Sequence, residues 1–107
     1  MMKIASNSET VEYADNRISK YSAQNGKCAI TGITLEYDDI HCHHILPKKF
    51  GGNDKFENLV IVHKDIHILI HATDANTINK YIQKFNLNKK QMDKLNKFRK
   101  LANNTII

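Results

Sequence analysis

Histidine is concentrated in one stretch of this chain of 107 residues. All six histidines lie between His41 and His71, and His67 and His71 stand four residues apart. Side chains four apart on a helix project from the same face, so two such imidazoles can share one ion. Neutral imidazole is a common ligand of divalent transition metals. The stretch therefore predicts a metal site to which a helix at 64–73 contributes.

The adjacent pair His43 and His44 adds a second chemical element. An imidazole that is not bound to metal can take a proton from water, while a metal ion neutralises the charge that develops on a phosphate. Together these two groups suffice to hydrolyse a phosphodiester. In a regular strand His43 and His44 would point to opposite faces. We therefore expect an irregular strand end that lets both side chains reach one site.

Hydrophobic periodicity and turn residues divide the chain into helices around a β-hairpin. We expect a helix at 11–25, capped by Ser8 or Thr10 and stopped by Gly26. Runs of β type occur at 27–30, 40–46 and 59–62, and helical patterns at 64–73, 75–85 and 89–102. A long basic loop joins the last two strands. The expected fold class is α+β, a hairpin plus helix with an N-terminal helix and two C-terminal helices.

Three of these helices show a repeat at helical spacing that is apolar except at Arg99, and the repeat would pack on the hairpin and its helix. The repeating positions are Val11, Ala14, Ile18, Tyr21, Ile78, Tyr81, Ile82, Phe85, Met92, Leu95, Phe98, Arg99, Leu101 and Ala102. Of these, we expect Ile78, Tyr81, Ile82 and Phe85 to face inward.

The order of the parts is informative beyond the histidines themselves. A strand ends in His43-His44-Ile45-Leu46-Pro47, and a Gly-Gly loop, Asn58, a second strand and the His67/His71 helix follow. Over residues 26–73 this order resembles the motif of the HNH endonucleases. That resemblance implies the ββα-metal (His-Me finger) fold.

The HNH resemblance also implies a role for each matching position. His44 corresponds to the general base, and Asn58 to the asparagine that fixes the loop and hairpin holding the base. His43, His67 and His71 correspond to the metal ligands. The implied cofactor is a divalent ion, Mg²⁺ or Mn²⁺, with Zn²⁺ as an alternative. Asn58 on its own is also compatible with an ordinary turn or cap residue.

A narrower family shares longer runs with this chain, at 23–32, 39–44, 68–73 and 95–102. These runs are similar to the C-terminal endonuclease domain of group II intron reverse transcriptase/maturases. That family nicks one strand of double-stranded DNA, which implies DNA as substrate and intron RNA or a reverse transcriptase/maturase as further partners. No polymerase segment fits before Tyr13, so we interpret the chain as a free-standing relative or a fragment.

The chain length suits one nuclease domain over 1–107. We divide it into a lead-in at 1–10, a helix at 11–25, a ββα-metal core at 27–73 and a basic helical tail at 74–107. The net charge of +5 favours a polyanionic partner, and eight basic residues from Lys80 onward are opposed by Asp93 alone. The expected nucleic-acid contacts are Lys48, Lys49, Lys97, Arg99 and Lys100. A solvated basic surface is the alternative for these side chains.

The two cysteines, Cys28 and Cys42, are too few for a disulfide framework. With no signal-peptide pattern and no apolar run of ~18 residues, we expect an intracellular, cytoplasmic protein of bacterial or organellar origin with no membrane partner. Many HNH proteins hold a structural zinc with two Cys-x-x-Cys pairs. Here Thr31 replaces the second cysteine after Cys28, and the second pair falls on His63 and Ile66, so structural zinc is not expected.

Several assignments remain open at the level of sequence. Cys42 is a buried small hydrophobe or a ligand, and His41 is a partner of the site or a polar strand residue. His63 is a strand-end residue or a ligand. The functional hypothesis is a metal-dependent endonuclease acting on DNA. The alternatives are a nuclease fold that has lost catalysis and only binds DNA or RNA, and a zinc-stabilised binding module.

Overall fold

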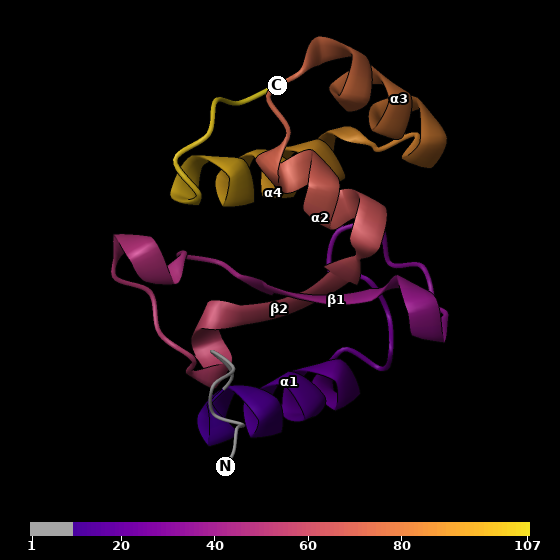
Figure 1. Ribbon diagram of the computed structural model, residues 1–107. Coiled ribbons are helices and arrows are strands. Elements are labelled where there is room, and N and C mark those ends of the chain that lie inside the picture. Colours follow the sequence, from indigo (N-terminus) through magenta and orange to yellow (C-terminus); the bar gives the residue numbers. More distant parts are fainter. Residues whose placement is uncertain (1–9) are drawn as a thin grey trace.

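A computed structural model describes residues 10–107 (Figure 1). Its helices and strands are α1 Val11–Ala23, β1 Ile40–His44, β2 Leu59–His63, α2 Lys64–His71, α3 Ala75–Phe85 and α4 Lys89–Leu101. The two strands form an antiparallel hairpin, and α2 follows β2 directly. The predicted α+β class is therefore confirmed, with its hairpin plus helix, one N-terminal helix and two C-terminal helices.

The hairpin is the middle layer of the molecule, with α1 on one face and α2 and α4 on the other (Figure 1). Strand β2 carries the apolar run 59–62, and all four of its side chains are buried. A strand that is covered on both faces is typically apolar without interruption. Two strands alone are marginally stable in water, so the helices on both sides stabilise the hairpin.

The segment 27–30 does not form the expected strand. Lys27 makes only an isolated bridge to Thr34, and Cys28 N–H donates to the carbonyl of Ile33 at 2.9 Å. Gly32 has φ +75°, a conformation that glycine adopts readily, and it turns the chain back on itself. The segment is therefore a tight turn and not a strand. The next predicted strand, 40–46, ends two residues early, at His44.

Helix α1 is attached by polar contacts more than by its apolar repeat. Val11 and Ile18 are 78% and 63% exposed. The side chain of Gln24 instead donates to the Ile61 carbonyl at 2.9 Å and accepts from the Ile61 N–H at 3.0 Å. An edge strand leaves backbone groups unpaired, and the amide of Gln24 satisfies two of them.

The start of α1 follows one of the two expected caps. Thr10 is the N-cap and accepts from the N–H of Tyr13, whereas Ser8 and the rest of the lead-in before Thr10 lie outside the described residues. Within residues 10–107 no helix has both the length and the apolar character needed to cross a lipid bilayer.

The C-terminal helices hold α2 in place. Arg99 Nη1 donates to the carbonyls of Leu69 and Ala72, and Asn104 Nδ2 donates to those of Ile70 and Ala72. The last carbonyls of a helix need such partners. Leu95 and Phe98 of α4 are buried, and the four expected inward positions of α3 pack against the core, as predicted. The tail thus fixes the helix that carries His67 and His71.

Candidate metal centre and catalytic site

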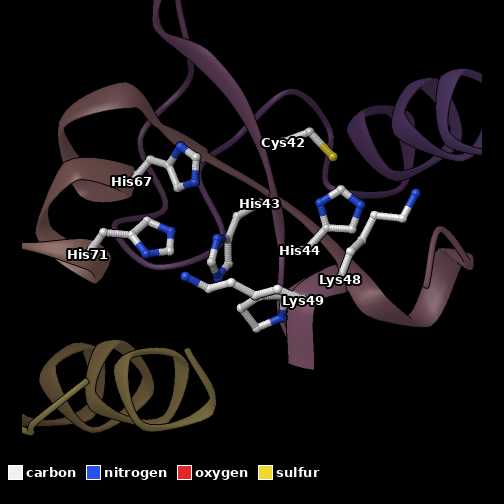
Figure 2. Close-up of a pocket in the computed structure, with 8 residues that line it drawn as sticks. Cys42, His43, His44, Lys48, Lys49, His67 and His71 are labelled. Atoms are coloured by element: carbon white, nitrogen blue, oxygen red, sulfur yellow. The ribbon is translucent and has the colours of Figure 1, made fainter. Parts of the chain in front are cut away.

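Three histidines meet between β1 and α2 (Figure 2). One nitrogen from each of His43, His67 and His71 lies within 4.8 Å of the other two. Their ring centroids are 5.1 to 5.2 Å apart. His43 comes from the strand and is 2% exposed, and the other two come from one face of α2. In the part of the chain that the structure describes, this is the group with metal-binding geometry.

The chemistry of this trio fits a divalent ion. His43 Nε2 is buried and has no hydrogen-bond partner, which is costly for a polar atom unless another ligand satisfies it. Burial, followed by the neighbouring His67 and His71, lowers the pKa of His43 to about 3. Burial and the adjacent imidazoles likewise lower the pKa of His67 to about 4. Both rings are therefore neutral near pH 7, the form that binds metal.

His41 lies beside the trio on the same face of β1. Its Nδ1 is 3.0 Å from Nδ1 of His67, so one of the two rings donates a hydrogen to the other. A hydrogen-bonded partner commonly orients a metal-ligating histidine. Of the two interpretations left open by the sequence, this contact favours a partner of the site.

His44 points to the opposite face of the hairpin. Its ring stacks on Tyr13 with centroids 5.2 Å apart, and its Nε2 is 2.8 Å from Asp54 Oδ1. The pairing of β1 with β2 continues through His44, so the expected irregular strand end is wrong. The strand does not need to bend for both histidines to reach one site. In the described sheet β1 pairs only with β2, so its other edge is open. Side chains from both faces of β1 line one pocket across its open edge (Figure 2).

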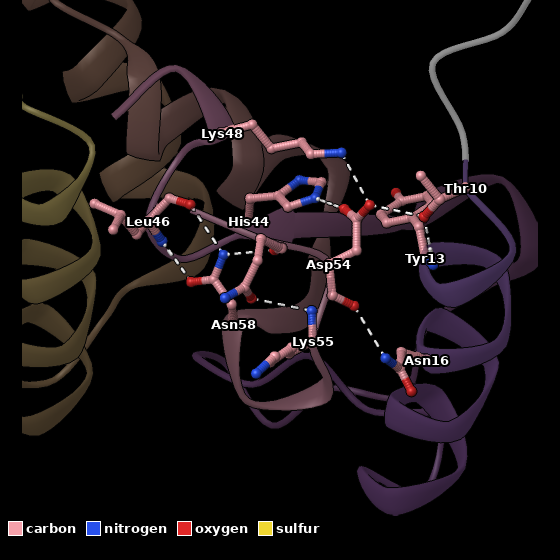
Figure 3. Close-up of polar contacts among 10 residues, drawn as sticks. Thr10, Tyr13, Asn16, His44, Leu46, Lys48, Asp54, Lys55 and Asn58 are labelled. Carbon is pink, nitrogen blue, oxygen red and sulfur yellow. Dashed lines mark hydrogen bonds and ion pairs between the residues drawn. The ribbon is translucent and has the colours of Figure 1, made fainter. Parts of the chain in front are cut away.

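Asp54 is the residue of the pocket region that the sequence analysis missed. Its carboxylate is 5% exposed and accepts from His44, from Lys48 Nζ at 2.9 Å and from Thr10 Oγ1 at 2.7 Å (Figure 3). These hydrogen bonds, His44 first, hold the pKa of Asp54 well below its usual range. In sequence, Asp54 looked like an ordinary residue of a Gly-Gly-Asn turn. No spacing rule indicated that the loop would return it to His44.

Asn58 ties together the two ends of the loop that carries Asp54 (Figure 3). Its Oδ1 accepts from the N–H of Leu46, and its Nδ2 donates to the carbonyls of Leu46 and Asn53. The loop also needs its glycines, because Gly51 has φ +99° and a Cβ on Gly52 would overlap the carbonyl of Leu46. The contacts of Asn58 therefore fix the path between His44 and Asp54.

Residues 26–73 match the family model of the HNH endonucleases. An HNH domain indicates a nuclease, a hydrolase that typically depends on a divalent metal and generally acts on DNA. The matched segment holds β1, β2, α2 and every histidine, while α1, α3 and α4 lie outside it. Neither the curated proteins nor the solved structures contain a match to this chain.

Two lysines, Lys48 and Lys49, lie in the loop that joins β1 to β2, and their surroundings differ. Lys48 Nζ is paired with Asp54, whereas the amine of Lys49 points toward His43 and His71 (Figure 2). After burial, the charge of Lys49 is the largest contributor to the lowered pKa of His71. Lys49 is thus the loop lysine whose charge is directed at the three-histidine group.

The three C-terminal residues expected to contact nucleic acid differ in their exposure. Lys97 and Lys100 are exposed on α4. Arg99 is fully buried, and its Nε also donates to the carbonyl of Thr105 at 2.7 Å. The prediction that Arg99 contacts nucleic acid is therefore wrong, because its guanidinium lies inside the fold and binds the end of α2.

The cysteines and His63 of the HNH segment lie outside the three-histidine group. Cys28 is 2% exposed, with its Sγ 3.5 Å from the N–H of Thr31. Cys42 is half-buried and packs against the core. His63 accepts from the N–H of Asp65 at the start of α2, and its Nε2 is 3.4 Å from Asp39. These contacts favour a packing role for both cysteines and a strand-end role for His63.

Proposed function

We propose that this protein is a metal-dependent endonuclease that hydrolyses phosphodiester bonds of double-stranded DNA and nicks one strand. The observation that carries the proposal is the pocket that His44 shares with the three-histidine group, in which His43 Nε2 has no partner. The HNH match over the same residues supports a nuclease. The charge of Lys49 beside the group suits a phosphate.

We propose that His43, His67 and His71 hold the divalent ion. The group offers three imidazole nitrogens and no carboxylate, and such donors suit transition metals better than Mg²⁺. This favours Zn²⁺, the alternative ion, over the expected Mg²⁺ or Mn²⁺, which suit oxygen ligands. The bound ion would supply positive charge to the phosphate and to the departing oxygen.

His44 is proposed as the general base that takes the proton of the attacking water. Its ring lies at the edge of the pocket and is held by the loop that Asn58 closes. Within residues 10–107 the hydrogen bonds of the Asn58 side chain all go to backbone groups, so its proposed role is to position the loop and not to react. Lys49, Lys97 and Lys100 are proposed to contact DNA phosphates, whereas Lys48 is engaged by Asp54.

The proposal is tested by relaxation of supercoiled plasmid with the full chain in Mn²⁺, Zn²⁺, Mg²⁺ or chelator. We expect nicked circles that depend on metal, and their loss in His44→Ala. His63→Asn is a matched control, because it removes a histidine of the HNH segment but leaves a side chain that can cap α2. Absence of cleavage in every metal, with DNA still shifted on a gel, would instead support a nuclease fold that has lost catalysis and only binds nucleic acid.

A role in group II intron mobility, with intron RNA or a reverse transcriptase/maturase as partner, stays a prediction from the sequence. The HNH match supports the chemistry without reference to intron RNA or a reverse transcriptase/maturase. If this role is correct, the purified chain should cleave one strand of a DNA target and leave the other intact. Equal cleavage of both strands on end-labelled duplex would argue against it.

A further inference from the structure

Asp54 divides its two carboxylate oxygens between different partners (Figure 3). Oδ1 contacts His44 Nε2, while Oδ2 accepts from Thr10 and from Lys48. One oxygen is therefore dedicated to the histidine, and the other is occupied by two donors. Such a division fixes the orientation of the carboxylate relative to the ring.

This arrangement selects one form of the His44 ring. An ionised carboxylate only accepts hydrogen bonds, so the hydrogen between the two residues is on Nε2. A neutral imidazole carries one N–H, which leaves the lone pair on Nδ1. Among the described residues no hydrogen bond reaches Nδ1. The ring plane is fixed as well, since Tyr13 stacks on it at an interplanar angle of 11°.

The first turn of α1 completes this environment from outside the HNH-matched segment. Thr10 caps the helix by accepting from Tyr13 N–H at 2.9 Å, and its hydroxyl donates to Asp54. Asn16 donates to the backbone carbonyl of Asp54 at 3.0 Å. The same short helix therefore holds both the carboxylate and the face of the His44 ring.

We propose that Asp54, held by the first turn of α1, is a positioning residue that fixes His44 in the tautomer whose Nδ1 accepts the proton of water. The inference rests on the proposed nuclease function of His44. It assigns the reacting atom of the base and gives α1 a part in catalysis. If Asp54 served only to dock α1 on the loop, it would affect folding without acting through His44.

Asp54→Asn tests the tautomer directly. Lys48 can only donate, so the amide oxygen should take the place of Oδ2 and the amide NH₂ should face His44. Nε2 would then have to accept, and the hydrogen would move to Nδ1. We expect this reversal to lower kcat on the order of 10²-fold or more with little change in KM. In the His44→Ala background the same substitution should cause no further loss.

The first readout is the ¹⁵N NMR spectrum of the imidazoles in the metal-free full chain at about pH 9, where histidines are neutral. We expect the His44 hydrogen on Nε2 in the wild type and on Nδ1 in Asp54→Asn. Asp65→Asn is the matched control, because it removes another buried aspartate that pairs with a lysine away from the pocket. It should leave the His44 signals unchanged.

The outcomes separate this inference from the proposed function. A wild-type His44 with its hydrogen on Nδ1 overturns the positioning role even in an active nuclease, and so does an additive loss of kcat in the double variant. Absence of cleavage by the wild type overturns the proposed function, whatever the tautomer. The wild-type spectrum needs no substitution, so a variant that fails to fold does not remove the test.

Discussion

The two faces of the hairpin place neighbouring histidines in opposite chemical surroundings. On the α2 face, His43 is buried beside two other imidazoles, and among the described residues the charges that affect its pKa are those of histidines. On the α1 face, His44 is bonded to the carboxylate of Asp54. Neutral imidazoles with unpartnered nitrogens suit a metal, whereas an imidazole with a carboxylate partner suits proton transfer. One step of strand alternation is enough to separate the two chemistries.

The two faces also differ in how they are held together. The α2 face rests on the apolar core and on the buried Arg99, which binds the end of α2. The α1 face rests on side-chain hydrogen bonds from Thr10, Asn16 and Gln24. Regions with few buried apolar contacts open more readily. We therefore expect the surroundings of His44 to depend more on single residues than the three-histidine group does.

The largest expected effect is on the α1 face. His44→Ala should reduce the rate of plasmid cleavage by roughly 10²- to 10⁴-fold, the usual contribution of a general base. Metal affinity, measured by titration calorimetry, should stay at the wild-type value because His44 is outside the three-histidine group. Wild-type cleavage by this variant would remove the distinction between the two faces.

The converse substitution addresses the α2 face. His43→Ala removes one of three proposed ligands and should weaken Mn²⁺ or Zn²⁺ binding by more than about 100-fold, since even the partners that orient ligands contribute 10- to 100-fold. Cleavage at limiting metal should fall with it and recover in part at high metal concentration. Unchanged affinity in calorimetry would mean that the ion, if present, binds elsewhere.

The two loop lysines, one beside each face of the hairpin, should have smaller effects, and these concern DNA binding. Lys49→Ala should weaken DNA binding and reduce the slope of log K against log salt by about 1, the effect of one lost phosphate contact. Lys48→Ala is the matched variant and should leave the slope unchanged, because its amine is engaged by Asp54. Equal slopes for the two variants in a fluorescence titration over a salt series would show that they do not differ in this way.

The smallest effect concerns acid stability on the α1 face. The pKa of Asp54 is lower in the folded chain than in the unfolded one, so its stabilisation is complete above about pH 4 and is lost as pH falls further. The wild type should therefore lose stability below about pH 4 more steeply than Asp54→Asn. Parallel acid unfolding curves, followed by circular dichroism, would contradict this.

The sequence predicted what depends on spacing along the chain. Helix α3 has the expected bounds, and the hairpin and α2 follow in the expected order. The turn at 27–34 was not predicted, because its local hydrogen bonds, such as that of Cys28 N–H to Ile33, outweighed the β-type pattern. The exposure of Val11 and Ile18 was not predicted either, because long-range polar contacts hold α1. Asp54 was missed because the three-dimensional path of its loop decides its partner, His44.

Arg99 carried two conflicting signals in the sequence, its place in the helical repeat of 89–102 and its positive charge. It stands four residues after Leu95 and one after Phe98, both of which are buried. That spacing places all three side chains on the inward face of α4. A basic residue in a basic tail was assigned to nucleic acid by composition, although helical periodicity indicated the core.

The side chain of Gln24 has a consequence for self-association. Strand β2 carries a run of four large apolar residues, and sequences of this kind, when they present a free edge, recruit identical strands into fibrils. At Ile61, near the middle of that run, both backbone groups are already bonded to the amide of Gln24. The N–H of Ala29 also donates to the Ile61 carbonyl at 3.0 Å. An incoming strand would have to displace both contacts before it could add there, so Gln24 and Ala29 together protect the hairpin against edge-to-edge aggregation.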